Sequence, residues 1–229
     1  MKFIIIGLGN FGTSLGEKLT AMGHEVIGVD NRMNKVELLK ERLTHTICLN
    51  CTDQHAVESL PLKDTDVVLV TIGEDEGANI LTTALIKQMN VKRLISRAIS
   101  PIHETILTAM GVDEILHPEE ETAARWAKKL ILNNVIDSFE LPDHHNIVEI
   151  MVPKEFVGKS LGEIGLSRNY GIIVLTTIIL LEEKNIFGKP RKVNKIKGVA
   201  TSETILNAGE IMVIYGHIHD IEKLLKEYS

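Results

Sequence analysis

The sequence predicts an α/β fold, in which a doubly wound parallel sheet is followed by a small α+β domain. In residues 1–135, short apolar runs alternate with amphipathic segments. The apolar runs lack polar alternation, which is typical of parallel strands that are buried on both faces. After residue 135, strand-like runs follow one another with few helical segments between them. We therefore expect two domains, comprising residues 1–135 and 136–229.

The first domain is expected to alternate between strand and helix. Its strands are rich in Ile, Val and Leu, and its helices place apolar residues on one face, as Leu15 and Leu19 do in the first. Right-handed crossovers between such strands give a doubly wound sheet. The expected strands are 2–6, 25–30, 46–50, 66–72, 93–98 and 113–116, and the expected helices are 11–23, 33–43, 78–89, 101–110 and one from residue 119.

The second domain is expected to be a small α+β unit, in which strand-like runs replace the regular alternation of strand and helix. A polar stretch, residues 184–204, is interpreted as a loop between two of them. The expected strands are 139–142, 147–152, 171–183 and 210–216, and the expected helices are a short one at 157–166 and a closing one at 220–228.

Charge and hydropathy exclude two classes of protein. The formal net charge is −6, whereas a general nucleic-acid binder needs a basic surface. The five cations from Lys189 to Lys197 lack aromatic partners and are interpreted as part of a solvated loop. The longest apolar run, residues 172–181, is shorter than the roughly 20 residues that span a membrane. We expect a soluble, cytoplasmic protein that binds no nucleic acid.

A glycine-rich loop directly follows the first expected strand. Gly7, Gly9 and Gly12 fit the G-x-G-x-x-G pattern of Rossmann domains, with Asn10 and Phe11 between the last two glycines. Such a loop brings backbone N–H groups at a helix N-terminus to a phosphate. Asp30 ends the second strand, where a carboxylate accepts hydrogen bonds from ribose hydroxyls and repels a 2′-phosphate. These residues predict a site for an adenine nucleotide other than NADP.

Further residues are expected at the carboxyl edge of the same sheet, where ligands of such sheets bind. Arg97 ends the fifth strand and is interpreted either as a cation that reaches a terminal phosphate or as a surface ion-pair partner. The other candidates are Asn31, Asn50, Cys51, Thr52, Thr71, Ile72, Gly73 and Glu74.

Enzymatic chemistry finds little support in the sequence. Cys48 and Cys51 form a C-x-x-C pair, but two further zinc ligands are lacking, and free cysteines often serve as small buried hydrophobes. Residues 140–229 contain no convincing acid–base constellation. The histidines in that part, His144, His145, His217 and His219, are interpreted as solvated or capping residues.

Several motifs in a fixed order give the chain a family resemblance. It resembles the RCK (KTN, TrkA-type) regulatory subunits of Trk and Ktr potassium uptake systems over essentially its whole length. The motifs are IIIGLGNFGTSLG (4–16), MGHEVIGVD (22–30), the TIGED…ANILTT block (71–83), ISRAISPIHETIL (95–107), MGVDEILHPEEETA (110–123), GKSLGEIGLSRNYGI (158–172) and NAGEIMVIYGHIHDIEKL (207–224).

The resemblance implies an RCK N-terminal nucleotide-binding domain and an RCK C-terminal domain. It implies a homo-oligomer, with dimers assembling into a ring beneath a membrane-embedded potassium transporter at the inner face of the membrane. Exchange of ATP for ADP, or of NADH for NAD, would then gate ion flux. Glu119 matches a glutamate that is linked in the family to a cation bridging the phosphates, although acidic residues also suit a helix start.

Two further points follow from the resemblance. ATP-responsive relatives often carry an arginine at the position of Asn10, and an asparagine lacks that charge. ATP or ADP and NAD or NADH therefore both remain open as ligands. Some relatives bind cyclic di-AMP in the C-terminal domain, and the corresponding region here contains Ile164, Arg168, Asn169 and Tyr170, which interface packing would equally explain.

Three functions remain in view. The first is a non-enzymatic, nucleotide-sensing subunit that gates a potassium transporter. The second is the regulatory part of a potassium channel or cation–proton antiporter. The third is a small NAD-dependent oxidoreductase, which would differ from both by turning its nucleotide over.

Overall fold

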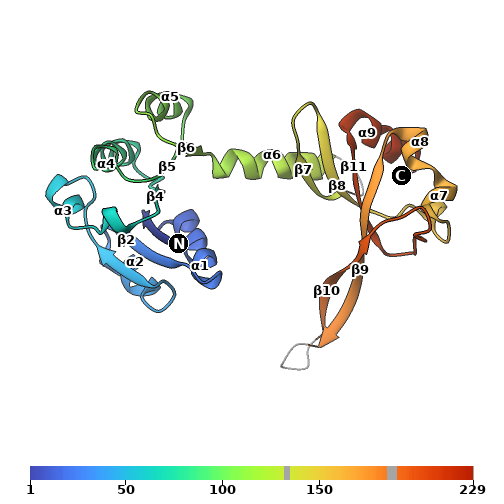
Figure 1. Ribbon diagram of the computed structural model, residues 1–229, viewed down its shortest axis with the longest axis horizontal. Helices are drawn as coiled ribbons and strands as arrows, with labels where there is room; N and C mark the ends of the chain where they lie inside the picture. The colour runs from blue at the N-terminus through green and yellow to red at the C-terminus, as the bar shows by residue number, and fades with distance from the viewer. Residues whose placement is uncertain (132–134, 185–189, 229) are drawn as a thin grey trace. The chain divides into compact units, whose positions relative to one another are not determined.

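The chain forms two compact units, Met1–Glu120 and Glu121–Ser229, in the computed structural model (Figure 1). The structure describes residues 1–131, 135–184 and 190–228. Helix α6 (Pro118–Ile131) contains the division between the units. The predicted domain boundary after residue 135 lies 15 residues after this division, beyond the end of α6, and stays a prediction.

The first unit contains a six-stranded parallel sheet. Its strand order is β3-β2-β1-β4-β5-β6, so the chain leaves β1 in one direction and returns to the other side of it with β4. This is the doubly wound order that the alternation of strands and helices predicts. The strands are β1 (Lys2–Ile6), β2 (Glu25–Asp30), β3 (His45–Cys48), β4 (Val67–Val70), β5 (Leu94–Arg97) and β6 (Glu114–Leu116).

Both faces of this sheet are covered, which explains the unbroken apolar runs. Ile4 and Ile6 of β1 belong to a core with residues of helices α3 and α4. Phe3 and Ile5 belong to a second core on the opposite face, with residues of α1 and α2. The helices are α1 (Asn10–Ala21), α2 (Met33–Leu39), α3 (Gln54–Glu58), α4 (Glu76–Gln88) and α5 (Pro101–Ala109), with a 3₁₀ turn, η1 (Leu62–Asp64).

The strand ends bring three loops to one edge. Ile6 at the end of β1 pairs with Val29 of β2 and with Val70 of β4. The glycine-rich loop therefore lies between the loops that follow β2 and β4. This is the topological switch point, at which ligands of doubly wound sheets bind.

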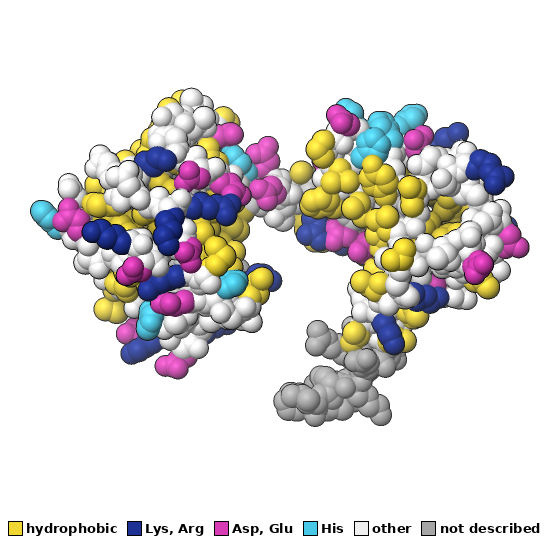
Figure 2. Space-filling model, viewed as in Figure 1, with side chains coloured by type: hydrophobic (Ala, Val, Ile, Leu, Met, Phe, Trp, Pro, Cys, Tyr) yellow, Lys and Arg dark blue, Asp and Glu magenta, His cyan; other side chains and the backbone are white. Residues whose placement is uncertain are grey.

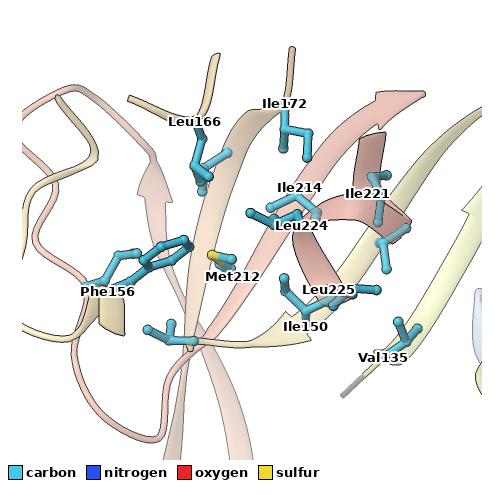
Figure 3. Close-up of a cluster of buried hydrophobic side chains, with 14 residues drawn as sticks. Val135, Ile150, Phe156, Leu166, Ile172, Met212, Ile214, Ile221, Leu224 and Leu225 are labelled. Atoms are coloured by element: carbon cyan, nitrogen blue, oxygen red, sulfur yellow. The ribbon is translucent and has the colours of Figure 1, made fainter. Parts of the chain in front are cut away.

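The second unit contains a five-stranded antiparallel sheet in the order β10-β9-β11-β8-β7. Helices α8 and α9 pack against it around a core that includes Ile150, Met212 and Leu224 (Figure 3). The elements are β7 (Val135–Glu140), β8 (His145–Met151), η2 (Lys154–Phe156), α7 (Leu161–Ile164), α8 (Leu166–Tyr170), β9 (Ile173–Lys184), β10 (Pro190–Val199), β11 (Ile211–His217) and α9 (Ile218–Glu227).

Two sequence predictions about elements were wrong, and one element was missed. The polar stretch predicted as a loop contains β10, an edge strand whose backbone pairs with β9; its residues 185–189, including Lys189, lie outside the described residues. The single helix predicted at 157–166 is divided, because Gly165 adopts a left-handed conformation between α7 and α8. The short helix α3 was not predicted, and its five residues are too few to show a helical period.

The surfaces of the two units differ in character. Basic and acidic side chains are interspersed on the visible face of the Met1–Glu120 unit, whereas hydrophobic side chains gather on the visible face of the other unit (Figure 2). Within the described ranges, no helix combines the length and the apolar character needed to cross a membrane.

Candidate nucleotide-binding site

The turn after β1 requires glycine at its first position. Gly7 has φ +103°, and its N–H donates to the carbonyl oxygen of Val29 at 2.8 Å. A Cβ on Gly7 would lie 2.8 Å from the backbone nitrogen of Ile72. Conformation and space therefore both exclude a larger residue here, and the chain can turn sharply into α1.

Helix α1 presents its N-terminus to the same edge. The N-cap is Gly9, which has no side chain that could accept a hydrogen bond from the first turn. The first intrahelical hydrogen bond runs from the N–H of Thr13 to the carbonyl oxygen of Gly9 at 2.9 Å. The N–H groups of the first turn therefore have no partner within the helix. Such a terminus, free of acidic side chains in its first turn, suits a phosphate.

Thr71, which directly follows β4, supports the glycine-rich loop through its hydroxyl group. Its hydroxyl lies 2.7 Å from the carbonyl oxygen of Gly7 and 3.1 Å from that of Ile6. A Cβ on Gly12 would overlap the same Gly7 carbonyl and lie 2.6 Å from the Thr71 hydroxyl. Gly12 thus permits α1 to pack closely on the sheet, as the third glycine of the pattern predicts.

Asp30 connects the end of β2 to the glycine-rich loop. Its carboxylate accepts a hydrogen bond from the N–H of Leu8 at 2.8 Å and another from the N–H of Arg32 at 3.0 Å. The side chain is 5% exposed. Asp30 therefore fixes the conformation of the glycine-rich loop. It also lies at the position where an acceptor for the ribose hydroxyls was predicted.

Arg97 lies at the opposite side of the loop, at the end of β5. Its guanidinium packs over Gly73 and forms an ion pair with Glu119. The Nε atom is buried without a hydrogen-bond partner among the described residues. Arg97 thus has an ion-pair partner, but its side chain is only 13% exposed and is not at the surface, and the guanidinium lies beside the space where a phosphate was predicted.

A buried amide holds the ends of β4 and β5 together. The side-chain nitrogen of Asn79, on α4, donates to the carbonyls of Ile72 at 2.8 Å and of Arg97 at 3.2 Å. Its oxygen lies within 3.2 Å of the hydroxyls of Ser96 and Thr83, which both donate to it. This network fixes the loop that carries Gly73 and the end of β5 that carries Arg97 relative to each other.

These elements enclose a cavity of about 760 Å³, a size typical of small-molecule sites. Gly12 lies beneath the cavity and does not line it. All the other predicted site residues of this unit line it together. They are Gly7, Gly9, Asn10, Phe11, Asp30, Asn31, Asn50, Cys51, Thr52, Thr71, Ile72, Gly73, Glu74, Arg97 and Glu119. That they bind a nucleotide remains a prediction at this point.

Comparisons with known proteins show the family of the chain. The model of the TrkA-N domain family matches residues 3–118, which include every residue that lines the cavity except Glu119. The chain belongs to the TrkA-N family. It is 31% identical to the Ktr system potassium uptake protein C of Bacillus subtilis (strain 168), over 98% of this chain and 96% of that protein. It is 30% identical to the Ktr system potassium uptake protein A of the same organism, over 99% and 96% of the two chains.

Solved structures share the fold of this TrkA-N protein. The GsuK RCK domain matches all of the chain with a TM-score of 0.65 and 16% sequence identity, and the match covers 47% of that chain. The GsuK channel bound to NAD matches with a TM-score of 0.64 and 17% identity, over all of this chain and 40% of the other. The protein thus spans less than half of those structures.

Sequence reasoning missed several residues of the site in this TrkA-N protein, Arg32 among them. Lys35 lines the cavity from α2, Thr82 lines it from α4 with its hydroxyl buried, and Asn79 supports it from below. The sequence marked none of them, because their roles depend on where α2 and α4 cross the sheet edge. Asn79 did leave a signal in the sequence. It stands among apolar residues of a helix, and asparagine is seldom buried in such a position without a specific role.

The residues predicted for a second ligand lie in the other unit, and only one of the four lines a cavity there. Arg168 lines a cavity of about 440 Å³ with residues of α7, α8, β9 and the 200–202 segment. Asn169 donates instead to the carbonyl of Ile164, and the hydroxyl of Tyr170 donates to Glu227 at 2.6 Å. Ile164, Asn169 and Tyr170 do not line that cavity.

The cysteines and three histidines of the second unit have contacts that explain their positions without a chemical role. Burial and the charge of Asp30 raise the pKa of Cys51 to about 12, so its thiol stays protonated at neutral pH, and Cys48 is also a free thiol. His217 caps α9, where its Nδ1 accepts from the N–H of His219 at 3.3 Å. The rings of His144 and His145 contact that of His217.

Proposed function

We propose that this TrkA-N protein is the nucleotide-sensing regulatory subunit of a membrane-embedded potassium uptake system. The cavity at the carboxyl edge of the sheet supports the nucleotide part, because it joins a helix N-terminus, a carboxylate beside the predicted ribose position and a cation. Similarity to two Ktr system potassium uptake proteins over nearly the whole chain supports the potassium part.

The ligand is an adenine nucleotide, either ATP and ADP or NAD and NADH. The N-terminus of α1 receives its phosphates, and the space near Asp30 receives the adenosine ribose. Asn10 lines the cavity without a charge, so Arg97 is the cation that we assign to the phosphates. A neighbour in fold is the GsuK channel bound to NAD, which supports a dinucleotide as readily as ATP.

The ion pair of Arg97 with Glu119 gives the site a way to respond to phosphate charge. A terminal phosphate competes with Glu119 for the Arg97 guanidinium, since both are anions. The released Glu119, whose side chain is 66% exposed, is then available to bind a cation that also bridges the phosphates. Ligands that differ in their terminal phosphate would stabilise different states of this pair.

Regulation requires an assembly, and we propose homo-oligomers in which dimers form a ring at the cytoplasmic face of the membrane, bound to the transporter. Large apolar side chains that stand exposed on one chain fit subunit contacts, among them Leu81 of α4, Ile102 of α5 and Trp126 of α6. Nucleotide exchange gates flux only when the nucleotides bind two ring states with different affinities.

A second ligand, cyclic di-AMP, belongs to the same proposal. Arg168 lines the cavity beside α8 and offers its guanidinium to a phosphate. Replacing Arg168 with Gln should weaken cyclic di-AMP binding and leave binding of ATP or NAD unchanged. Equal binding by both proteins would remove cyclic di-AMP from this site.

The proposal is tested first by calorimetric titration of the purified protein with ATP, ADP, AMP, NAD and NADH. Binding at micromolar concentration, with the nucleotide recovered chemically unchanged after incubation, is the expected result. A nucleotide that returns oxidised or reduced would instead favour an oxidoreductase. Failure of every nucleotide to bind would contradict the proposal.

The assembly and its partner need separate measurements. Light scattering should report an oligomer, and a monomer of 25.4 kDa with and without nucleotide would contradict the ring. Addition of the protein to vesicles that contain its transporter should change potassium flux in a nucleotide-dependent way. Control of a potassium channel or of a cation–proton antiporter in place of a transporter would redefine the partner.

A further inference from the structure

Four charged side chains meet at one end of the cavity. Asp30 ends β2, Arg32 and Lys35 lie at the start of α2, and Glu74 lies in the loop between β4 and α4; all four line the cavity. Arg32 Nη1 lies 2.9 Å from one carboxylate oxygen of Glu74, and Lys35 Nζ lies 3.6 Å from the other. Glu74 thus joins two loops that are separate in the sequence.

The two carboxylates of this cluster are not equivalent. Asp30 is 5% exposed, and each of its oxygens already accepts a backbone N–H, from Leu8 and from Arg32. Glu74 is 69% exposed. A ligand that enters this end of the cavity therefore meets the charge of Glu74 before that of Asp30.

Glu74 also offsets part of the positive charge of Arg32 and Lys35. Arg32 and Lys35 each approach both carboxylates: Arg32 Nε lies 3.4 Å and Lys35 Nζ 4.0 Å from Asp30. The hydrogen bond from Arg32 and the charge of Lys35 lower the pKa of Glu74, which therefore stays ionised at neutral pH. Two cations and two anions leave this end of the cavity with no net charge, and loss of Glu74 would leave it positive.

This balance bears on which adenosine ribose fits. An acidic residue after the second strand favours a free 2′-hydroxyl, whereas a 2′-phosphate is bound by an arginine near the same place. The chain carries both kinds of residue side by side. Arg32 has a guanidinium suited to two hydrogen bonds with a phosphate, but Glu74 occupies it.

We propose that Glu74 is a specificity-determining residue, which excludes nucleotides with a 2′-phosphate by holding Arg32 and Lys35 as its own ion-pair partners. This inference rests on the proposed function, since it requires the adenosine ribose to lie between β2 and the Glu74 loop. A 2′-phosphate would have to displace Glu74 from both cations and remain close to two carboxylates. A free 2′-hydroxyl has neither requirement.

The test compares NAD with NADP on wild-type protein and on Glu74→Gln, by calorimetric titration at one ionic strength. The wild type should bind NAD at least about tenfold more tightly than NADP. In Glu74→Gln, the ratio of the two dissociation constants should fall by about tenfold, which corresponds to about 1.4 kcal/mol of selectivity. This fall should come mainly from tighter NADP binding, with a smaller change in the affinity for NAD.

Two further variants locate the effect. Glu58→Gln removes the same charge from α3, where Glu58 does not line the cavity, and should leave the ratio unchanged. Glu74→Gln combined with Arg32→Gln should lose the gain in NADP binding, because the freed guanidinium is absent. Both controls separate a local ion-pair effect from a change in overall charge.

Other outcomes overturn the inference in recognisable ways. Equal changes in NAD and NADP affinity upon Glu74→Gln would mean that Glu74 does not select between them. A wild type that binds NADP as tightly as NAD would contradict the exclusion itself. Absence of binding by NAD, ADP and ATP would instead overturn the proposed function, and the inference with it.

Discussion

Gly12 lies directly against Gly7 where helix α1 crosses the end of the sheet. A Cβ at Gly12 would overlap the Gly7 carbonyl oxygen and lie 2.6 Å from the Thr71 hydroxyl, both of which are parts of the supporting structure. Gly12→Ala should therefore lower the free energy of unfolding by about 1–3 kcal/mol, the usual cost of overpacking. Denaturant unfolding measures it, and an unchanged midpoint would contradict the close packing described.

Gly9 provides the matched substitution in the same loop. Its φ of −74° suits any residue, and no atom lies within 4 Å of an added Cβ. Gly9→Ala should leave the stability within about 0.5 kcal/mol of the wild type. It should nevertheless weaken nucleotide binding at least about tenfold, because the methyl group lies at the cavity wall where we propose that the phosphates bind. Full-strength binding by Gly9→Ala would place the phosphates elsewhere.

Asp30 links stability to binding. In Asp30→Asn an NH₂ group replaces one carboxylate oxygen. This group cannot accept a hydrogen bond, so the backbone N–H of either Leu8 or Arg32 loses its acceptor. A buried unpaired donor costs about 1–3 kcal/mol, so the variant should unfold at lower denaturant concentration. Affinity for an adenine nucleotide should fall with it. Retention of both properties would show that the carboxylate charge and its second acceptor are dispensable.

Much of the fold could be predicted, because the local pattern and the tertiary environment agree. The strands of the first unit are buried on both faces, so each appears as an unbroken apolar run, and the glycine spacing marks the loop after β1. Strand β10 could not be predicted in this way. Its exposed residues include Lys195 and Lys197, and it is ordered by backbone pairing with β9 at the sheet edge.

The site was predictable for residues at strand ends and not for the contacts between them. Asp30, Thr71 and Arg97 each follow an apolar run, so the carboxyl edge could be listed from the sequence. The pairing of Glu74 with Arg32 has no local signal, because the two lie in loops that only the strand order β2-β1-β4 brings together. Long-range contacts of this kind require the assembled fold.

Asn79 allows a test of the buried polar network. Asn79→Leu keeps a similar shape and removes every hydrogen bond that joins Ile72, Ser96, Thr83 and Arg97 through its amide. Several buried polar groups then lose a partner, and the free energy of unfolding should fall by about 2 kcal/mol or more. Thr83→Val removes one of these bonds and should cost less. A larger loss in Thr83→Val than in Asn79→Leu would contradict the central role of the amide.

His103 should make the stability depend on pH. It is fully buried in α5, and among the described residues neither ring nitrogen has a hydrogen-bond partner. Burial lowers the pKa of His103, and the carboxylate of Glu76, 3.6 Å from its Nδ1, opposes that shift only in part. The unfolded state, with a histidine pKa of about 6.5, therefore binds the proton more readily than the folded state. By linkage, this contribution to stability is fully present above about pH 6.5 and is lost as the pH falls towards the lower folded pKa.

Denaturant unfolding at several pH values between about 7.5 and 5.5 checks this expectation, since the slope of stability against pH counts protons taken up on unfolding. His103→Gln cannot titrate, so its profile should be flatter than that of the wild type, whatever its stability at pH 7.5. Glu76→Gln keeps an acceptor for the Ser100 hydroxyl and removes the opposing charge, so its profile should be steeper. Parallel profiles for all three proteins would mean that His103 is protonated equally in the folded and unfolded chains, and that its burial carries no cost.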